Sequence, residues 1–218
     1  MHGYLADRRS FYYQLNYFSR YFEVFAPDLK GFGENKGMDY PYALDDYISE
    51  VEEFKYKNSI VKPHIIAHSF GGRIAIKAAA ENCEFCNKLV LTGAAGLKPK
   101  NTPKKAIKKA LFSVLKKFVK KENLTRFYSK DYLALDGVMK ESFKKIITEH
   151  LDGHLVKIKN KTLIVFGDKD KETPLYMARA LNKGIADSRL ITIKDAGHFC
   201  FIDKPNKFNL EVREFLLS

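Results

Sequence analysis

The sequence predicts an α/β fold: a mainly parallel sheet with helices on both faces, and a helical insertion. Two observations carry this prediction. Short apolar runs alternate with longer segments whose apolar residues recur at helical spacing, as is typical of a parallel sheet covered on both faces. In addition, one central segment holds the whole excess of basic charge, and this change of composition marks it as an insertion.

Length and composition fit a single domain with an inserted subdomain. A chain of 218 residues, 45% of them hydrophobic, can bury a sizeable core. No apolar run has the length of a bilayer span, and the start MHGYLADRRS lacks the order of a signal peptide. Three cysteines provide no disulfide framework, so we expect a reducing, cytoplasmic environment.

The formal net charge of +12 is concentrated in residues 98–161, which carry 18 basic and 6 acidic residues. Residues 1–97 carry 11 and 12, and residues 162–218 carry 9 and 8. We therefore predict a core built from 1–97 and 162–218 and a basic helical insertion over 98–161. Its lysine-rich face is either simply solvated or binds an acidic partner: an acyl carrier protein, an anionic membrane surface or an anionic substrate. Nucleic acid fits the charge but has no supporting motif.

The first half of the chain shows three helical patterns and three strand patterns. The helices have apolar residues three or four positions apart, and the strands are short apolar or alternating runs. In chain order, the predicted elements are a helix over Phe11–Phe18, a strand over Tyr21–Ala26, a helix over Tyr42–Tyr56, a strand over His64–Ala67, a helix from Arg73 to about Asn82 and a strand over Lys88–Thr92.

The second half begins with two cap helices and then returns to the alternating pattern. Between Pro103 and Glu122 one apolar stripe faces lysines, and a second helix is predicted over about Leu135 to Leu151, with Ile147 among its inward residues. The remaining predicted elements are a strand over Thr162–Phe166, a helix over Leu175–Leu181, a strand over Arg189–Ile193 and a helix over Asn206–Leu217.

Ser69 lies where the strand over His64–Ala67 turns into a helix. A serine on such a sharp turn exposes its hydroxyl beyond the sheet, and the backbone N–H groups of the helix start lie beside it. Such a turn needs small residues on either side, and Ala67 and Gly71 stand there, giving A-x-S-x-G in place of the usual G-x-S-x-G. By itself, the pentapeptide fits a glycine-rich turn with a bystander serine as well as a nucleophile.

Two further strand ends carry polar residues. Gly167-Asp-Lys-Asp170 follows the strand over Thr162–Phe166, and Asp195-Ala-Gly-His198 follows the strand over Arg189–Ile193. The carboxyl ends of parallel strands line one edge of a sheet, so serine, acid and histidine can meet there. Each residue alone would be an ordinary turn residue, but this order at three strand ends predicts a catalytic triad.

These segments together resemble the α/β-hydrolase superfamily, in its cap-bearing branch of esterase-like and C–C-bond hydrolases. The resemblance covers nearly the whole chain. It rests on His2-Gly3, Asp28-Leu-Lys-Gly-Phe-Gly, Ala67-His-Ser-Phe-Gly-Gly, Gly167-Asp-Lys-Asp with Pro174, and Gly197-His198. It implies an α/β-hydrolase fold with a helical cap between the strands over Lys88–Thr92 and Thr162–Phe166, where the basic segment lies.

The chemistry assigns a role to each predicted site residue. Ser69 attacks a carbonyl carbon, His198 accepts the serine proton and returns it to the leaving group, and Asp170 orients the imidazole. Asp168 is the competing acid, and the family pattern favours Asp170. The backbone N–H of Phe70 is one predicted oxyanion donor, and the resemblance implies that of Tyr4 as the other.

The sequence therefore predicts a serine hydrolase for a small or medium carboxylic ester or related acyl compound, with no cofactor. A C–C hydrolase with the same triad is the alternative, and a catalytically idle binding protein is the third possibility. Serine at position 69 argues against dehalogenases and epoxide hydrolases, whose nucleophile is aspartate.

Other candidate residues are weaker. Cys83 and Cys86 form a CxxC that supplies only two metal ligands, with Cys200 far away in sequence. His150 and His154 have helix-face spacing, but Asp152-Gly153 between them predicts a loop. His68 is interpreted as a packing residue.

The chain starts at Met1-His2-Gly3, whereas family members place strands before the His-Gly loop. From the resemblance we expect an N-terminally truncated fold. In it, the strands over Tyr21–Ala26 and His64–Ala67 would each lack a neighbour, and the Tyr4 donor would lie on a free chain end.

Overall fold

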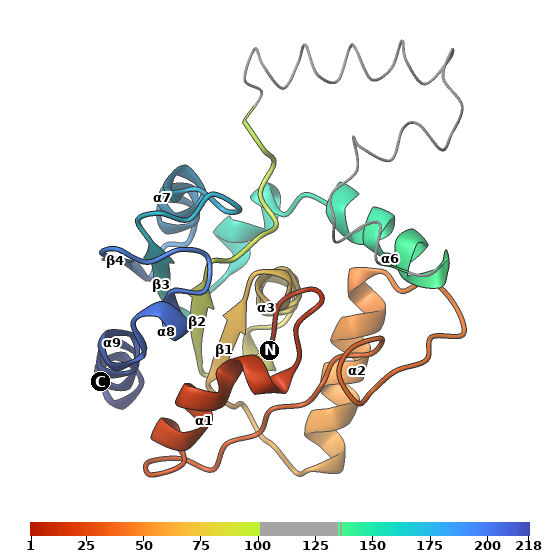
Figure 1. Cartoon of the computed structure of the whole chain (residues 1–218), viewed down its shortest axis with the longest axis horizontal. Helices are drawn as coiled ribbons and strands as arrows, with labels where there is room; N and C mark the ends of the chain where they lie inside the picture. Colours follow the sequence, from red (N-terminus) through yellow and green to blue (C-terminus); the bar gives the residue numbers. More distant parts are fainter. Residues whose placement is uncertain (101–134, 136) are drawn as a thin grey trace.

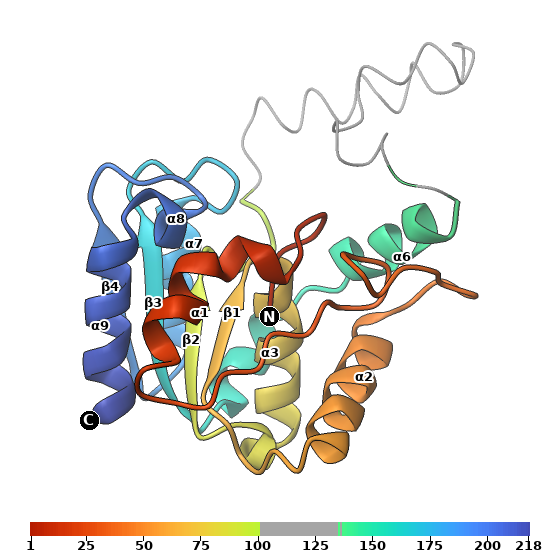
Figure 2. The same cartoon turned by 60° about the horizontal axis from the view of Figure 1, so that its bottom comes forward.

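The computed structural model describes residues 1–100, 135 and 137–218. Within these residues, four parallel strands form one sheet in the order β1-β2-β3-β4, which runs across the middle of the molecule in Figures 1 and 2. The strands are β1 (Ile65–His68), β2 (Lys88–Thr92), β3 (Lys161–Gly167) and β4 (Ser188–Ile193). This arrangement confirms the predicted fold class. The four strands predicted from β1 onward are all present, with helices between them along the chain.

Helices cover both faces of the sheet. The α-helices are α1 (Tyr12–Phe18), α2 (Leu44–Lys57), α3 (Phe70–Glu81), α6 (Gly137–Thr148), α7 (Leu175–Gly184), α8 (Cys200–Asp203) and α9 (Pro205–Leu217). Three 3-10 helices are described, namely η1 (Arg8–Phe11), η2 (Cys83–Phe85) and η4 (Asp152–Lys157). The predicted helices over Phe11–Phe18, Tyr42–Tyr56, Arg73–Asn82, Leu175–Leu181 and Asn206–Leu217 are confirmed to within a few residues at each end.

The alternation of side chains along the strands divides the core in two. Leu91 and Ile164 point into a cluster with α2, α3 and α7, whereas Val90 and Val165 point into a cluster with α1, α8 and α9. Both faces of each central strand are therefore buried, which explains why β2 and β3 read as nearly continuous apolar runs. In Figure 2, α1 and α9 lie on one side of the sheet and α3 on the other.

The register brings the strand ends to one edge. His68 pairs with Thr92, Thr92 pairs with Val165, and Gly167 pairs with Ile193. The residues that follow these strands therefore emerge side by side, as the sequence pattern predicted.

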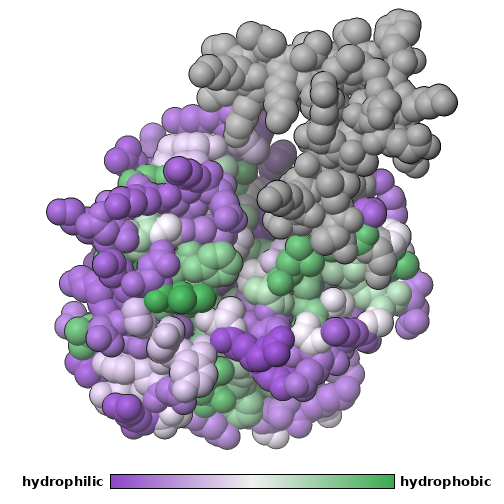
Figure 3. Space-filling model, in the orientation of Figure 1, coloured by the Kyte–Doolittle hydropathy of each residue, from purple (hydrophilic) through white to green (hydrophobic). Residues whose placement is uncertain are grey.

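The predicted strand over Tyr21–Ala26 is wrong, because the structure has no strand in this segment. A strand forms only where a neighbour satisfies its backbone groups, and no described strand lies beside this one. Instead, a groove of about 480 Å³ separates it from the outer edge of β1, lined by apolar residues such as Phe22 and Ile66. On the face of the described residues that Figure 3 shows, hydrophobic surface lies in patches among hydrophilic side chains.

Met1 occupies part of the outer edge of β1. Its amino group donates to the Ile66 carbonyl at 2.6 Å, and its carbonyl accepts from the His68 N–H at 3.0 Å. This is the hydrogen-bond pattern of a parallel bridge opposite Ala67. The residues before the Tyr4 loop are thus fixed to β1, the strand that leads into Ser69.

Helix α6 matches the second predicted cap helix, which was placed over about Leu135 to Leu151. Met139 and Ile146 are buried as predicted, but Ile147 is 41% exposed, so its predicted inward position is wrong. The Arg73 guanidinium from α3 donates to the carbonyls of Ile146 and Glu149, satisfying acceptors at the end of α6. The helix predicted between Pro103 and Glu122 lies outside the described residues, and the division into core and cap stays a prediction.

Within the described ranges, no helix combines the length and apolar character needed to cross a membrane.

Candidate active site

Ser69 occupies the turn between β1 and α3 with a backbone conformation that few non-glycine residues adopt, φ 49° and ψ −106°. Two hydrogen bonds hold this turn in place: the Ser69 N–H donates to the Thr92 carbonyl at 3.1 Å, and the Ser69 carbonyl accepts from the Ala95 N–H at 3.1 Å. The side chain therefore projects from the carboxyl edge of the sheet, at the first residue before a helix.

The small residue two positions after Ser69 is required by a close approach of the backbone. A Cβ on Gly71 would lie 2.6 Å from the Met1 carbonyl oxygen and 2.8 Å from that of His2. The Gly71 N–H donates to the His2 carbonyl at 3.1 Å. Gly71 thus lets the turn of Ser69 and the segment that leads to Tyr4 pack against each other.

Asp170 is a buried carboxylate with four hydrogen-bond donors. Its Oδ1 accepts from the backbone N–H groups of Glu172 and Thr173, both at 2.9 Å. Its Oδ2 accepts from the Thr173 hydroxyl at 2.8 Å and from His198 Nδ1 at 2.9 Å. Burial by itself raises the pKa of Asp170, but the hydrogen bonds from His198 and Thr173 outweigh it and hold the pKa below its ordinary value.

The imidazole of His198 is held between two carboxylates. Nδ1 donates to Asp170, and Nε2 lies 3.5 Å from Glu172 Oε2. In the described part of the chain, Ser69 Oγ makes no hydrogen bond to His198. Asp168, the competing acid, instead accepts from the Ala196 N–H at 3.3 Å, so the structure places Asp170 and not Asp168 on the histidine.

Tyr4 and Phe70 lie side by side, with ring centroids 5.3 Å apart. Phe70 is the first residue of α3, and its N–H has no hydrogen-bond acceptor among the described residues. The Tyr4 hydroxyl donates to the Met139 carbonyl of α6 at 3.1 Å. The two predicted oxyanion donors therefore belong to adjacent segments, one of which is tied to α6.

His2 fixes the start of the Tyr4 loop. Its Nδ1 lies 2.8 Å from the Gly3 carbonyl, which can only accept, so Nδ1 carries the proton. Its Nε2 then accepts from the Leu29 N–H at 3.0 Å. Burial lowers the pKa of His2 from its ordinary value, in keeping with this neutral tautomer.

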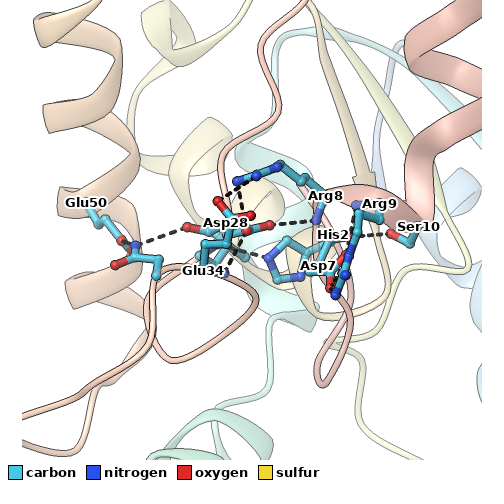
Figure 4. A network of polar contacts seen from close by, with 10 residues as sticks. His2, Asp7, Arg8, Arg9, Ser10, Asp28, Glu34 and Glu50 are labelled. Atoms are coloured by element: carbon cyan, nitrogen blue, oxygen red, sulfur yellow. Dashed lines mark hydrogen bonds and ion pairs between the residues drawn. The ribbon is translucent and has the colours of Figure 1, made fainter.

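The Asp28 loop supports His2 from the outside (Figure 4). The Asp28 carboxylate accepts from the backbone N–H groups of Arg8 at 2.7 Å and Glu34 at 2.9 Å, and it pairs with the Arg8 guanidinium at 3.1 Å. Glu50 from α2 joins through Asn35, whose amide donates to both Glu50 and the Asp28 carbonyl. The two loops of the resemblance that begin at His2 and Asp28 form one polar network.

The family model for the alpha/beta hydrolase fold matches residues 1–127, more than half of the chain. The chain belongs to this family. A second family model, described as TAP-like protein, matches residues 144–218. The protein is thus a hydrolase of the alpha/beta hydrolase fold, and the resemblance inferred from its motifs is confirmed.

Three relatives of this alpha/beta hydrolase indicate the range of its family. An AB hydrolase superfamily protein of Bacillus subtilis (strain 168), YisY, is 26% identical, with 99% of this chain and 89% of the relative covered. The 2-hydroxy-6-oxo-6-(2'-aminophenyl)hexa-2,4-dienoic acid hydrolase of Metapseudomonas resinovorans is 26% identical over 91% of this chain and 75% of its own. The solved esterase of Exiguobacterium antarcticum is 25% identical, covers 100% of this chain and 90% of its own, and has a TM-score of 0.79.

Sequence reasoning missed two residues that contact this site in the alpha/beta hydrolase. Thr173 bonds Asp170, and its hydroxyl also lies 3.1 Å from the Gly93 carbonyl and 3.2 Å from His198 Nδ1. Glu172 lies at Nε2 of His198. They stand two and three positions after Asp170 in the Asp-Lys-Glu-Thr-Pro turn, and the sequence shows this proximity but not the contacts themselves.

The cysteines lie apart from the site chemistry. Cys83, Cys86 and Cys200 are free thiols, and burial raises the pKa of Cys200 to about 11 and that of Cys86 to about 12. A thiol with a raised pKa is a poor nucleophile at neutral pH. The described residues contain no cluster of three or more histidine, cysteine or acidic side chains that would hold a metal ion.

Proposed function

We propose that the protein is a serine hydrolase that cleaves a carboxylic ester or a related acyl bond through an acyl-enzyme. The observation that carries the proposal is the 2.9 Å hydrogen bond from His198 Nδ1 to the buried Asp170, at the sheet edge from which Ser69 projects. Asp170 fixes the tautomer that leaves Nε2 free of its own proton and able to accept one.

In the proposed reaction, Ser69 Oγ attacks the carbonyl carbon while His198 Nε2 accepts its proton. The same nitrogen then protonates the leaving alcohol, and water repeats the sequence on the acyl-enzyme. The backbone N–H groups of Phe70 and Tyr4 stabilise the oxyanion, and losing one such donor typically costs about 3 kcal/mol of transition-state stabilisation. The residues on this path need no cofactor.

The Ser69 hydroxyl must approach His198 Nε2 before this reaction can start, because Ser69 Oγ makes no hydrogen bond to that nitrogen among the described residues, where Glu172 Oε2 lies 3.5 Å from it. A rotation about χ1 of a half-exposed serine is a small motion. Such hydrogen bonds are often long in free enzymes and tighten when substrate binds.

The test is covalent labelling with a fluorophosphonate, combined with turnover of p-nitrophenyl esters of increasing chain length. Ser69→Ala should abolish both labelling and turnover. Ser19→Ala, at an exposed serine on the surface near α1, is the matched control and should change neither. Labelling that survives in Ser69→Ala would overturn the assignment, and an unlabelled wild-type chain would favour a catalytically idle binding protein.

A C–C hydrolase is the second candidate function, favoured by the dienoic acid hydrolase among the relatives. The same triad would cleave a β-diketone-like bond, with a carbanion in place of the alkoxide leaving group. Comparing kcat/KM for a vinylogous 1,5-diketone and for the best p-nitrophenyl ester decides between the two. The acidic partner predicted for residues 98–161 remains a proposal, which differing salt dependence for carrier-bound and free acyl substrates would support.

A further inference from the structure

Glu172 lies at the solvent side of the candidate active site. Its Oε2 is 3.5 Å from His198 Nε2, and the exposed fraction of its side chain is 68%, against 7% for the histidine. Its backbone is fixed, since the Glu172 N–H donates to Asp170 Oδ1 at 2.9 Å. A negative charge is therefore built into the turn that also carries the acid of the proposed triad.

The Glu172 carboxylate lies near the alcohol part of the ester in the proposed reaction. In the proposed reaction, Nε2 of His198 delivers a proton to the leaving oxygen, which must come within about 3 Å of that nitrogen. Together with the 3.5 Å from Nε2 to Glu172, this places the alcohol part of an ester no more than about 6–7 Å from the carboxylate. The acyl part lies on the other side of the scissile bond, toward Ser69.

We infer that Glu172 is a specificity-determining residue that selects esters by the charge of their alcohol part. This inference rests on the proposed function and names its substrate class: esters whose alcohol carries a positive charge close to the ester oxygen are preferred, and anionic alcohols are rejected. At such a distance and partial exposure, one charge changes kcat/KM by about 3- to 10-fold at low ionic strength.

The rest of the chain does not produce the same preference. The formal net charge is +12, so the overall field of the protein attracts anions and repels cations. Of the two lysines beside Asp170, Lys169 is paired with Asp195 at 2.5 Å, and Lys171, directly before Glu172, is exposed. A preference for cationic alcohols would therefore come from a local carboxylate and would oppose the net charge.

The experiment compares three butyrate esters with one acyl group. They are butyrylcholine, its uncharged isostere 3,3-dimethylbutyl butyrate, and the anionic 2-sulfoethyl butyrate. In the wild-type protein at low salt, kcat/KM should be about 3- to 10-fold higher for the cationic than for the neutral ester. In Glu172→Gln this ratio should fall to 1 or below, and in Glu172→Lys the anionic ester should become the preferred substrate.

Glu84→Gln is the matched control variant. Glu84 has nearly the same exposed fraction as Glu172, 66%, and pairs with Lys62. It lies in η2 before β2, at the amino ends of the strands and the opposite edge of the sheet from Ser69. Its substitution changes the net charge by the same amount, so the cationic-to-neutral ratio should stay at the wild-type value.

The outcomes separate the inference from the proposed function. A cationic-to-neutral ratio of kcat/KM at or below 1 in the wild type, or the same ratio in wild type and Glu172→Gln, overturns the role of Glu172. Turnover of the neutral ester in that case still supports the proposed triad. If none of the three esters is hydrolysed and fluorophosphonate does not label Ser69, both the inference about Glu172 and the proposed function are overturned. A ratio that falls equally in Glu84→Gln would assign the effect to net charge and also overturn the inference.

Discussion

The turn that carries Ser69 and the loops that carry Asp170 and His198 meet at one sheet edge, yet different forces hold them. Asp170 and His198 are positioned by side-chain hydrogen bonds within a buried cluster. Ser69 is positioned by its backbone, with a positive φ, two backbone hydrogen bonds and close packing around Gly71. The proposed acid–base part should therefore be sensitive to small changes in chemistry, and the proposed nucleophile part to small changes in volume.

Asp170→Asn should produce the largest effect on the acid–base part. The amide is nearly isosteric, so the fold persists, but its NH₂ group favours the wrong imidazole tautomer. We expect kcat to fall by about 10³- to 10⁴-fold, with little change in the thermal midpoint. Steady-state ester kinetics and thermal unfolding measure the two quantities.

Asp168→Asn is the control for this prediction, because Asp168 bonds the Ala196 N–H and not His198. Its kcat should remain within a few-fold of wild type. If Asp168→Asn proves to be the inactive variant and Asp170→Asn the active one, the acid has been assigned to the wrong residue.

Gly71→Ala should affect the nucleophile part through volume. The added Cβ meets the carbonyl oxygens of Met1 and His2 well inside contact distance, so the Ser69 turn and the Tyr4 loop must separate. We expect a loss of about 1–3 kcal/mol in the free energy of unfolding. Because oxyanion geometry depends on both segments, turnover should also fall by about 10- to 100-fold.

Gly153→Ala is the matched control for Gly71→Ala, since a Cβ on Gly153 in η4 meets no atom within 4 Å. Thermal midpoints and ester kinetics of the two variants, measured side by side, separate packing at the turn from the general effect of replacing glycine. Equal and small effects in both would show that the contact with Met1 and His2 does not constrain Ser69.

The same difference explains what the sequence could predict. Ser69, Asp170 and His198 each follow a strand, and the parallel register necessarily brings such positions to one edge. Strands with two buried faces were recognisable as apolar runs. The segment Tyr21–Ala26 was not predictable in this way, because whether it forms a strand depends on a neighbour and not on its own residues.

The contacts of single side chains were also beyond the sequence. Nothing in the pattern around Asp170 indicated that Thr173 would bond its carboxylate or that Glu172 would face His198 Nε2, because both depend on the geometry of the turn. His68 was interpreted correctly as buried in packing, with 0% exposure, but its bond to the His198 carbonyl was not foreseen.

His68 lies between the two parts of the site, and its predicted effect on stability is absent at pH 8 and grows only below about pH 6.5. Its ring packs against that of His198, with centroids 4.6 Å apart, and Nε2 donates to the His198 carbonyl at 3.1 Å. Nδ1 is buried and has no hydrogen-bond partner among the described residues. Burial, followed by the nearby His198, lowers the pKa of His68 to about 3, because a proton on Nδ1 would place a charge where no acceptor meets it.

This lowered pKa makes stability depend on pH in a defined direction. Between about pH 6.5 and the folded pKa, the unfolded chain binds a proton at His68 that the folded chain does not, so stability falls as pH decreases. One such proton contributes a slope of up to about 1.4 kcal/mol per pH unit.

His68→Gln keeps a donor for the His198 carbonyl but cannot titrate. Urea unfolding at pH 8, 6, 5 and 4 should therefore show the stability difference between wild type and His68→Gln decreasing steadily below pH 6.5, with wild type losing its advantage. His64→Gln serves as the comparison: His64 is only partly buried, so its smaller lowering of pKa should give a weaker trend. A stability difference between wild type and His68→Gln that stays constant from pH 8 to 4 would show that His68 is not held neutral between the two parts of the site.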